Sequence, residues 1–195
     1  MGAGSVADAC KAAVADGCKV GVDYHGEYRV DWTNSLSEGL ENPIIHSTFG
    51  YAAQMVILDS ESGAVNKVVA AHDVGRAVNP LLCEGQVEGA VHMGLGYALS
   101  EGFPCDENGR PLNETLRSLD ILRPKDMPDV DVILVEAAEP NSPYGIKGVG
   151  EIGLVPTAGA VAAAMHAKDG QWRNELPLVN EANRERASSW VGQLS

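Results

Sequence analysis

Two apolar runs joined by a short polar turn constrain the fold of this chain most strongly. The run FGYAAQMVILD ends at Asp59, the turn SESG follows, and the run AVNKVVAAHDV ends at Val74. Both runs are rich in the β-branched and aromatic residues that favour strands, and the turn contains a glycine, as hairpin loops commonly do. The sequence therefore predicts a β-hairpin over residues 49–74.

A long helix is predicted over residues 80–100, where apolar side chains recur at four-residue intervals. The same segment carries four glycines: Gly85, Gly89, Gly94 and Gly96. Each glycine costs a helix up to about 1 kcal/mol relative to alanine. So many glycines in one helix indicate that another backbone or a ligand lies close against it.

The remaining segments predict an α+β fold of mixed helices and β-hairpins. Helices are expected over residues 5–15, with Ser5 as the N-cap and Gly17 at the end, over 156–167 and, as an amphipathic segment, over 180–191. A second hairpin is expected over residues 19–32 around a turn at His25 and Gly26, and a strand is expected over 130–136. Exposed loops are expected up to Pro43 and over 104–111.

Composition excludes several classes of function. The net charge of -13 is spread along the chain, which argues against nucleic acid or an anionic membrane as a partner. The four cysteines form no CxxC pair for zinc or an iron–sulfur cluster, and we interpret them as reduced thiols of a cytoplasmic protein. No apolar run approaches the roughly 20 residues that cross a bilayer. With 45% apolar residues, the chain can form a real core.

The segment NSPYGIKGVGEIG, residues 141–153, presents one carboxylate among several glycines. Gly145, Gly148 and Gly150 would let the backbone adopt positive φ angles and approach a ligand. Glu151 would then lie near the positive end of the following helix, where it could act as a general base. The pattern alone equally allows a carboxylate that only stabilises the helix dipole.

A second segment, residues 71–102, places the polar side chain of Gln86 among glycines at the start of the long helix. An amide both donates and accepts hydrogen bonds, so Gln86 could bind a metal-bound oxygen or the edge of a pterin, although a surface amide fits the pattern as well. His72 and His92 have no partner at a spacing typical of metal ligands, and we expect structural roles for both.

These motifs resemble the C-terminal lobe of the molybdenum hydroxylases, the xanthine dehydrogenase and aldehyde oxidoreductase family. The resemblance rests on DVGRAVNP, then GQVEGAVHMGLGYALSE, then GIKGVGEIGLVPTAGAVAAA some sixty residues later, in the family's order and spacing. It implies a molybdenum ion held by a pyranopterin dithiolene, with no direct metal ligand from the protein. Residues 1–195 would form one C-terminal lobe of the molybdopterin-binding domain.

The resemblance also implies a role for each candidate residue. Glu151 matches the family's catalytic base, and Gln86 matches a glutamine that binds the metal's oxo ligand or the pterin. Gly148 and Gly150 match the loop glycines that approach the cofactor. Ser5 lies in the opening segment GAGSVADACKAA, which is similar to the family's segment that follows a nucleotide-contacting Gly-Ser pair, and this likeness would place Gly4 and Ser5 near the phosphate of a pterin dinucleotide. Together these matches predict the cofactor-binding and catalytic residues of the site.

As an enzyme, the chain would be part of an oxidoreductase that hydroxylates a heteroaromatic, purine-like substrate or an aldehyde with oxygen from water. The family's subunit is several times longer, so we expect a fragment or split subunit that is inactive alone. Its partners would be the N-terminal part of the molybdopterin subunit, and domains or subunits that carry [2Fe-2S] clusters and FAD. The alternatives are a folded fragment that binds no cofactor, and an assembly module in which Glu151 only caps a helix.

Overall fold

A computed structural model describes residues 2–113, 115–116, 118–180 and 182–183 of the chain. These residues form two compact units. The first unit comprises the residues up to Gly50 together with Val74–Val78 and Glu136–Lys147. The second unit comprises Tyr51–Asp73, Asn79–Val135 and the residues from Gly148 onward. The chain therefore passes between the two units several times.

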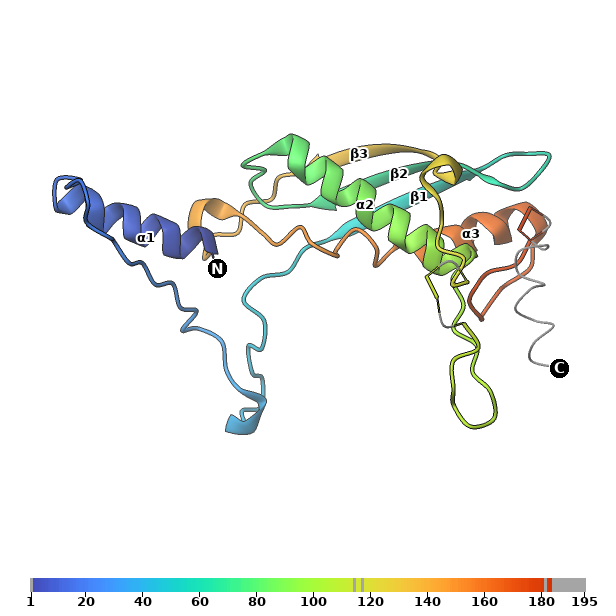
Figure 1. The fold of residues 1–195 in the computed structure, drawn as a ribbon, viewed down its shortest axis with the longest axis horizontal. Helices are drawn as coiled ribbons and strands as arrows, with labels where there is room; N and C mark the ends of the chain where they lie inside the picture. Colours follow the sequence, from blue (N-terminus) through green and yellow to red (C-terminus); the bar gives the residue numbers. More distant parts are fainter. Residues whose placement is uncertain (1, 114, 117, 181, 184–195) are drawn as a thin grey trace. The chain divides into compact units, whose positions relative to one another are not determined.

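The second unit is built on a three-stranded sheet in the order β1-β2-β3 (Figure 1). Strands β1 (Ala52–Leu58) and β2 (Val65–Asp73) pair antiparallel, which confirms the hairpin predicted over residues 49–74. The turn between them is stabilised by Asp59, whose Oδ1 accepts hydrogen bonds from the Ser62 backbone N–H and hydroxyl, both at 2.7 Å. Gly63 follows with a φ of 73°, a conformation that glycine adopts without steric cost.

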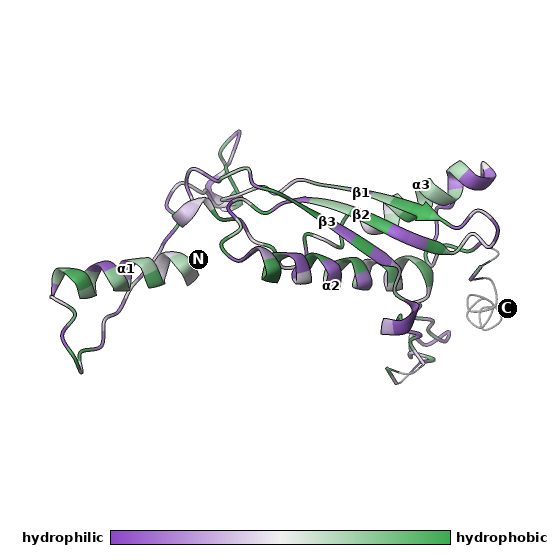
Figure 2. Cartoon of the chain, turned by 90° about the horizontal axis from the view of Figure 1, so that it is seen from above, coloured by the Kyte–Doolittle hydropathy of each residue, from purple (hydrophilic) through white to green (hydrophobic). Residues whose placement is uncertain are grey.

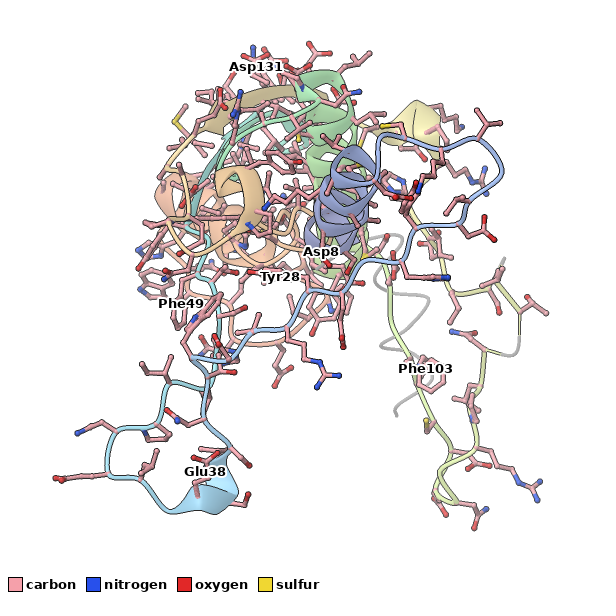
Figure 3. All side chains as sticks on the ribbon, turned by 90° about the vertical axis from the view of Figure 1, so that its left-hand side faces the viewer. Asp8, Tyr28, Glu38, Phe49, Phe103 and Asp131 are labelled. Carbon is pink, nitrogen blue, oxygen red and sulfur yellow. The ribbon has the colours of Figure 1, made fainter. Side chains whose placement is uncertain are left out.

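Strand β3 (Asp129–Val135) pairs parallel to β2, and it confirms the strand predicted over 130–136. Its sequence alternates acidic and apolar residues at first, visible as purple and green segments in Figure 2. Successive side chains of a strand point to opposite faces, so Val130 and Val132 face the core while Asp131 faces outward (Figure 3) and pairs with Lys67 on β2 at 2.5 Å. The crossover from β2 to β3 carries the long helix.

That helix, α2, spans Pro80–Leu99 and confirms the prediction over residues 80–100. Asn79 caps it by accepting a hydrogen bond from the Leu82 backbone N–H at 3.2 Å, and Pro80 occupies the first turn, where its missing N–H costs nothing. The four-residue apolar repeat places Val87, Val91 and Leu95 in the core. The periodic side chains thus fix which face of α2 packs on the sheet.

Helix α3 spans Thr157–Asp169, close to the predicted 156–167, and ends at Gly170 in the left-handed conformation. It contacts both β1 and α2. Its buried residues Val161 and Met165 join Val56, Val68 and Ala70 of the sheet and the apolar residues of α2 in one core. Burial of this core stabilises the second unit at about 25 cal/mol for each Å² of apolar surface removed from water.

The first unit contains α1 (Gly2–Ala15), which is followed by Gly17 at a φ of 74° as predicted. The predicted N-cap is wrong, because the helix already begins at Gly2 and Ser5 lies inside it. The physical reason is packing: the Tyr28 ring lies so close to Gly4 that any Cβ at that glycine would collide with it. Gly4 is thereby buried, and the first turn of the helix gains a packed partner.

The hairpin predicted over residues 19–32 is also wrong, since that segment contains no strand. It runs instead along α1 (Figure 3), where Asp8 accepts a hydrogen bond from the Glu27 backbone N–H at 3.1 Å. A Cβ at Gly26 would collide with the Ser5 carbonyl oxygen. Gly26 therefore allows this segment to pass close to α1, and it does not form the turn of a hairpin.

Three short 3-10 helices, η1 (Leu36–Glu38), η2 (Pro124–Asp126) and η3 (Pro143–Gly145), interrupt the loops of the described residues. The two ends of the loop predicted over 104–111 are joined by an isolated antiparallel β-bridge between the backbones of Cys105 and Pro111. Most of the helix predicted over 180–191 lies outside the described residues. Among the residues that the structure describes, no helix is long and apolar enough to cross a membrane.

Candidate functional site

Residues 148–156 form a loop of successive turns that precedes α3, named the Glu151 loop below. The Leu154 backbone N–H donates to the Glu151 carbonyl oxygen at 3.2 Å, and the Thr157 backbone N–H donates to that of Leu154 at 3.1 Å. Helix α3 begins only at Thr157, more than a full turn beyond Glu151. Because the dipole acts within the first turn of a helix, this distance weakens the interpretation of Glu151 as a helix-dipole partner.

The Glu151 side chain is exposed, and its carboxylate makes no hydrogen bond or ion pair with any residue that the structure describes. A carboxylate without a structural partner is free to accept a proton from a bound molecule. This freedom is what a general base requires.

The Glu151 loop packs directly on α2 through Gly153. A Cβ at Gly153 would lie 2.7 Å from the Cβ of Ala90 and 3.4 Å from the carbonyl oxygen of Val87. Only glycine allows this separation without a shift of one of the two segments. A second close approach follows at Gly94 of α2, where a Cβ would lie 2.6 Å from the Thr157 Cβ. The neighbours of the α2 glycines are side chains, Thr157 at Gly94 and Glu101 at Gly96, and Gly85 and Gly89 have open space. Within the described residues, no other backbone therefore lies against these four glycines, contrary to what the sequence led us to expect.

This packing brings Gln86 of α2 to the Glu151 loop, although the two are far apart in sequence. The Gln86 Nε2 lies 3.5 Å from the Gly150 carbonyl oxygen, the residue before Glu151. A hydrogen bond of that length is weak, and the side chain of Gln86 is exposed. The amide can therefore turn toward another polar partner at little cost.

Gly148 and Gly150 differ from the expectation that loop glycines adopt positive φ. Neither has a φ in the left-handed region, whereas Gly145 does, at 70°. Open space surrounds the position of a Cβ at both Gly148 and Gly150, and both residues are exposed. Their backbone is thus accessible to a ligand, but the turns of the Glu151 loop do not require glycine there.

Ser5 lies in the first unit, half-buried on α1, whereas Gln86, Gly148, Gly150 and Glu151 all lie in the second unit. The Ser5 carbonyl oxygen lies against Gly26, where a Cβ on the glycine would collide with it. The structure therefore groups four of the five predicted site residues in the second unit, and Ser5 belongs to the first unit.

The two histidines make contacts that fit structural roles. His92 bonds through Nε2 to the Leu122 carbonyl oxygen at 2.8 Å. His72 is fully buried on β2, and its Nε2 lies 3.1 Å from the amide nitrogen of Gln54 on β1. Burial lowers the pKa of His72 below its ordinary value, because an apolar environment disfavours the charged ring. Within the described part of the chain, no group of His, Cys, Asp and Glu side chains could hold a metal ion.

Gln54 is a residue that the sequence interpretation missed. Its Nε2 donates to the Gly153 carbonyl oxygen at 2.7 Å, so it links β1 to the Glu151 loop. The signal was present in the strand, because Gln54 occupies the same face of β1 as the core residue Val56. A glutamine at a core-facing position needs hydrogen-bond partners, and that requirement could have identified it.

Comparison with known proteins agrees with these motifs. Residues 2–128 match the family model described as "Molybdopterin cofactor-binding domain". The 6-hydroxypseudooxynicotine dehydrogenase complex subunit gamma of Paenarthrobacter nicotinovorans is 34% identical over 147 residues, covering 72% of this chain and 18% of that protein. The xanthine dehydrogenase molybdenum-binding subunit of Escherichia coli O157:H7 is 38% identical over 116 residues, covering 59% of this chain and 15% of that protein.

The fold also matches a solved structure, that of the aldehyde oxidoreductase from Desulfovibrio desulfuricans. The TM-score is 0.68 at 25% identity, over 89% of this chain and 19% of that one. The chain thus spans less than a fifth of the length of each of these three relatives. The α+β fold of this chain is shared with the matching part of that aldehyde oxidoreductase. With the family model matching well over half of its residues, this chain belongs to the molybdopterin cofactor-binding domain family.

Proposed function

We propose that this chain contributes the catalytic base and part of the cofactor site to a molybdenum hydroxylase. The observation that carries the proposal is the packing of the Glu151 loop on α2. It brings an unpaired carboxylate, Glu151, and an exposed amide, Gln86, to the same region from distant parts of the sequence. The region then offers a carboxylate that can accept a proton and an amide that can donate or accept a hydrogen bond to a bound molecule.

The residues present fit a molybdopterin cofactor. Gln86 can donate and accept hydrogen bonds, and open backbone at Gly148 and Gly150 can approach a polar ring or phosphate. A pyranopterin would bring its own sulfur ligands to the metal, so the proposal needs no metal-ligating side chain from this chain. When bound, the molybdenum centre would accept the two electrons released by the substrate.

Glu151 would remove a proton during the reaction, in which a C–H bond of the substrate and water give the hydroxylated product, two protons and two electrons. We expect a heteroaromatic, purine-like substrate or an aldehyde, because relatives are named as xanthine dehydrogenase and aldehyde oxidoreductase. The electrons must leave through other groups. We therefore expect the remaining part of the molybdopterin subunit and domains or subunits with [2Fe-2S] clusters and FAD as partners, in line with the relative named as one subunit of a complex.

Substitution of Glu151 by glutamine tests the role of the base. Glu151→Gln keeps the shape of the side chain but removes its basicity, so turnover per bound molybdenum should fall at least about 100-fold in the complete enzyme. Steady-state kinetics and metal analysis on the same preparation give this ratio. The control is Glu175→Gln, an exposed carboxylate beyond α3, which should leave turnover unchanged. Near-normal turnover of Glu151→Gln with molybdenum bound would refute the assignment.

A further inference from the structure

Beneath the Glu151 loop, two polar side chains lie on the core-facing side of the sheet. Gln54 of β1 and His72 of β2 lie two positions apart across the antiparallel pair, since Gln54 is opposite Ala70 and Ala52 is opposite His72. Residues in such diagonal positions on one face of a sheet can contact each other when their side chains are long. His72 is fully buried, and Gln54 is partly buried. The pair therefore sits inside the second unit.

The chemistry of the three groups fixes the direction of both hydrogen bonds. The Gly153 carbonyl oxygen can only accept, so the Gln54 amide nitrogen must face it, at 2.7 Å. The second hydrogen of that same nitrogen is directed at the His72 Nε2, at 3.1 Å. Because Nε2 must then accept, His72 is neutral and carries its proton on Nδ1. This requirement agrees with burial, which disfavours the charged ring.

We infer that Gln54 and His72 are positioning residues that hold the Glu151 loop on the sheet. His72 orients the Gln54 amide, and the amide fixes the Gly153 carbonyl, two residues beyond Glu151. The Gly153 carbonyl oxygen accepts two hydrogen bonds. The one from the Gln54 amide, at 2.7 Å, is shorter than the one from the Thr157 hydroxyl, at 3.2 Å. The catalytic consequence of this inference rests on the function proposed for Glu151, whereas the anchoring of the loop does not.

The pair leaves two buried polar atoms without a partner among the described residues, the Gln54 Oε1 and the His72 Nδ1. Buried polar atoms in folded proteins nearly always have hydrogen-bond partners, because an unpaired one is costly. Two apolar side chains would fill this part of the core without that cost. The polar pair is thus explained by the directional bond that it supplies to the Glu151 loop.

Hydrogen exchange on the full chain with its co-purifying partners tests the anchoring. The probes are the backbone amides of Leu154 and Thr157, whose hydrogen bonds close the turns of the loop. In Gln54→Met, which keeps side-chain length but removes the donor, these amides should exchange about ten times faster, while Val161 in α3 should stay unchanged. The matched control is Gln171→Met, an exposed glutamine beyond α3, in which all of these amides should exchange as in the unaltered chain.

A second variant, His72→Phe, keeps a buried ring but removes the acceptor, and it should accelerate the same two amides by a smaller factor. The inference would be overturned if the amides of Leu154 and Thr157 exchanged at the same rate in these variants as in the unaltered chain. It would also be overturned if the variants accelerated exchange equally at all amides of α2 and α3. In an enzyme that holds molybdenum, Gln54→Met should also lower kcat per metal about tenfold with KM unchanged. If the unaltered complex contains no molybdenum, the proposed function fails, yet the exchange rates still decide whether Gln54 anchors the loop.

Discussion

At the scale of single residues, the contact between Gly153 and Ala90 decides where the Glu151 loop lies. A Cβ at Gly153 would meet the Cβ of Ala90 at 2.7 Å, well inside van der Waals contact. One hydrogen atom in place of a methyl group thus sets the separation between the loop and α2. The same contact sets how near Gln86 lies to Glu151.

Gly153→Ala should therefore destabilise the chain by about 1–3 kcal/mol, because the loop or α2 must move to admit the methyl group. Gly148→Ala is the matched control, since open space surrounds that glycine in the same loop. It should be neutral or stabilising by up to about 1 kcal/mol, because alanine restricts the unfolded chain. Denaturant unfolding of both variants measures the difference, and equal stabilities would contradict the packing described for Gly153.

His72 makes stability depend on pH in a direction that its burial determines. Its pKa in the folded chain is lowered, chiefly by desolvation, from an unfolded value of 6.5. The unfolded state therefore binds the proton more readily, so protonation of His72 favours unfolding. The contribution of neutral His72 to the free energy of unfolding is complete above pH 6.5, and it declines as the pH falls toward the lower pKa of the folded chain. Unfolding free energies at about pH 8 and about pH 5 should differ less in His72→Phe than in the unaltered chain. An equal difference would exclude His72 as its source.

At the scale of elements, α3 is held at both ends by different means. At its start, Thr157 packs against Gly94 of α2, and its hydroxyl bonds to the Gly153 carbonyl oxygen. At its end, Gly170 adopts the left-handed conformation and lets the chain turn back. Arg173 then donates from Nη2 to the Asp169 carboxylate at 2.5 Å. The helix after the Glu151 loop is thereby fixed in both position and length.

The hydrogen bonds from Arg173 hold the pKa of Asp169 at about 2, well below the ordinary 3.8. This carboxylate therefore stabilises the fold above pH 3.8, and the effect is lost as the pH falls through about 2. Arg173→Met should return the pKa of Asp169 toward 3.8, as measured by NMR titration of the side-chain carboxyl carbon. A pKa that stays near 2 in this variant would show that the backbone N–H of Gln171, the next contributor, is sufficient.

At the scale of the whole molecule, the chain spans less than a fifth of the length of each of the three relatives compared above. Helix α2 illustrates what this means for the second unit. One face is buried in the core, while Leu82, Met93 and Tyr97 are exposed on another. Gly85 and Gly89 of the same helix have open space around them. Under the proposed function, further segments of a molybdopterin subunit would complete the site at such open positions.

We therefore expect molybdenum only in preparations that contain the partners. Metal analysis of the chain purified alone should give little molybdenum, and analysis of the complex recovered from its native host should give about one equivalent for each copy of the chain. Absence of molybdenum from both preparations would contradict the proposed function. It would favour the alternative of a folded chain that binds no cofactor.

The sequence by itself determined those elements whose signals are local. The hairpin of β1 and β2, helices α2 and α3, and strand β3 follow from periodicity, turn residues and caps that act within a few residues of one another. The motifs around Gln86 and Glu151 likewise identified the family before any contact was known. Local patterns failed where a distant surface intervened. The glycine at residue 26 signalled a hairpin but packs on α1, and Ser5 signalled a cap but lies inside the helix.

Tertiary structure decided how those elements meet. The parallel pairing of β2 with β3, the placement of Gln86 against the Glu151 loop and the link from Gln54 to Gly153 each join residues far apart in the chain. No local pattern encodes such contacts, because their energies depend on two surfaces fitting together and on the satisfaction of every buried polar group. The sequence thus predicted candidate residues for the site, whereas only packing determined which of them lie together.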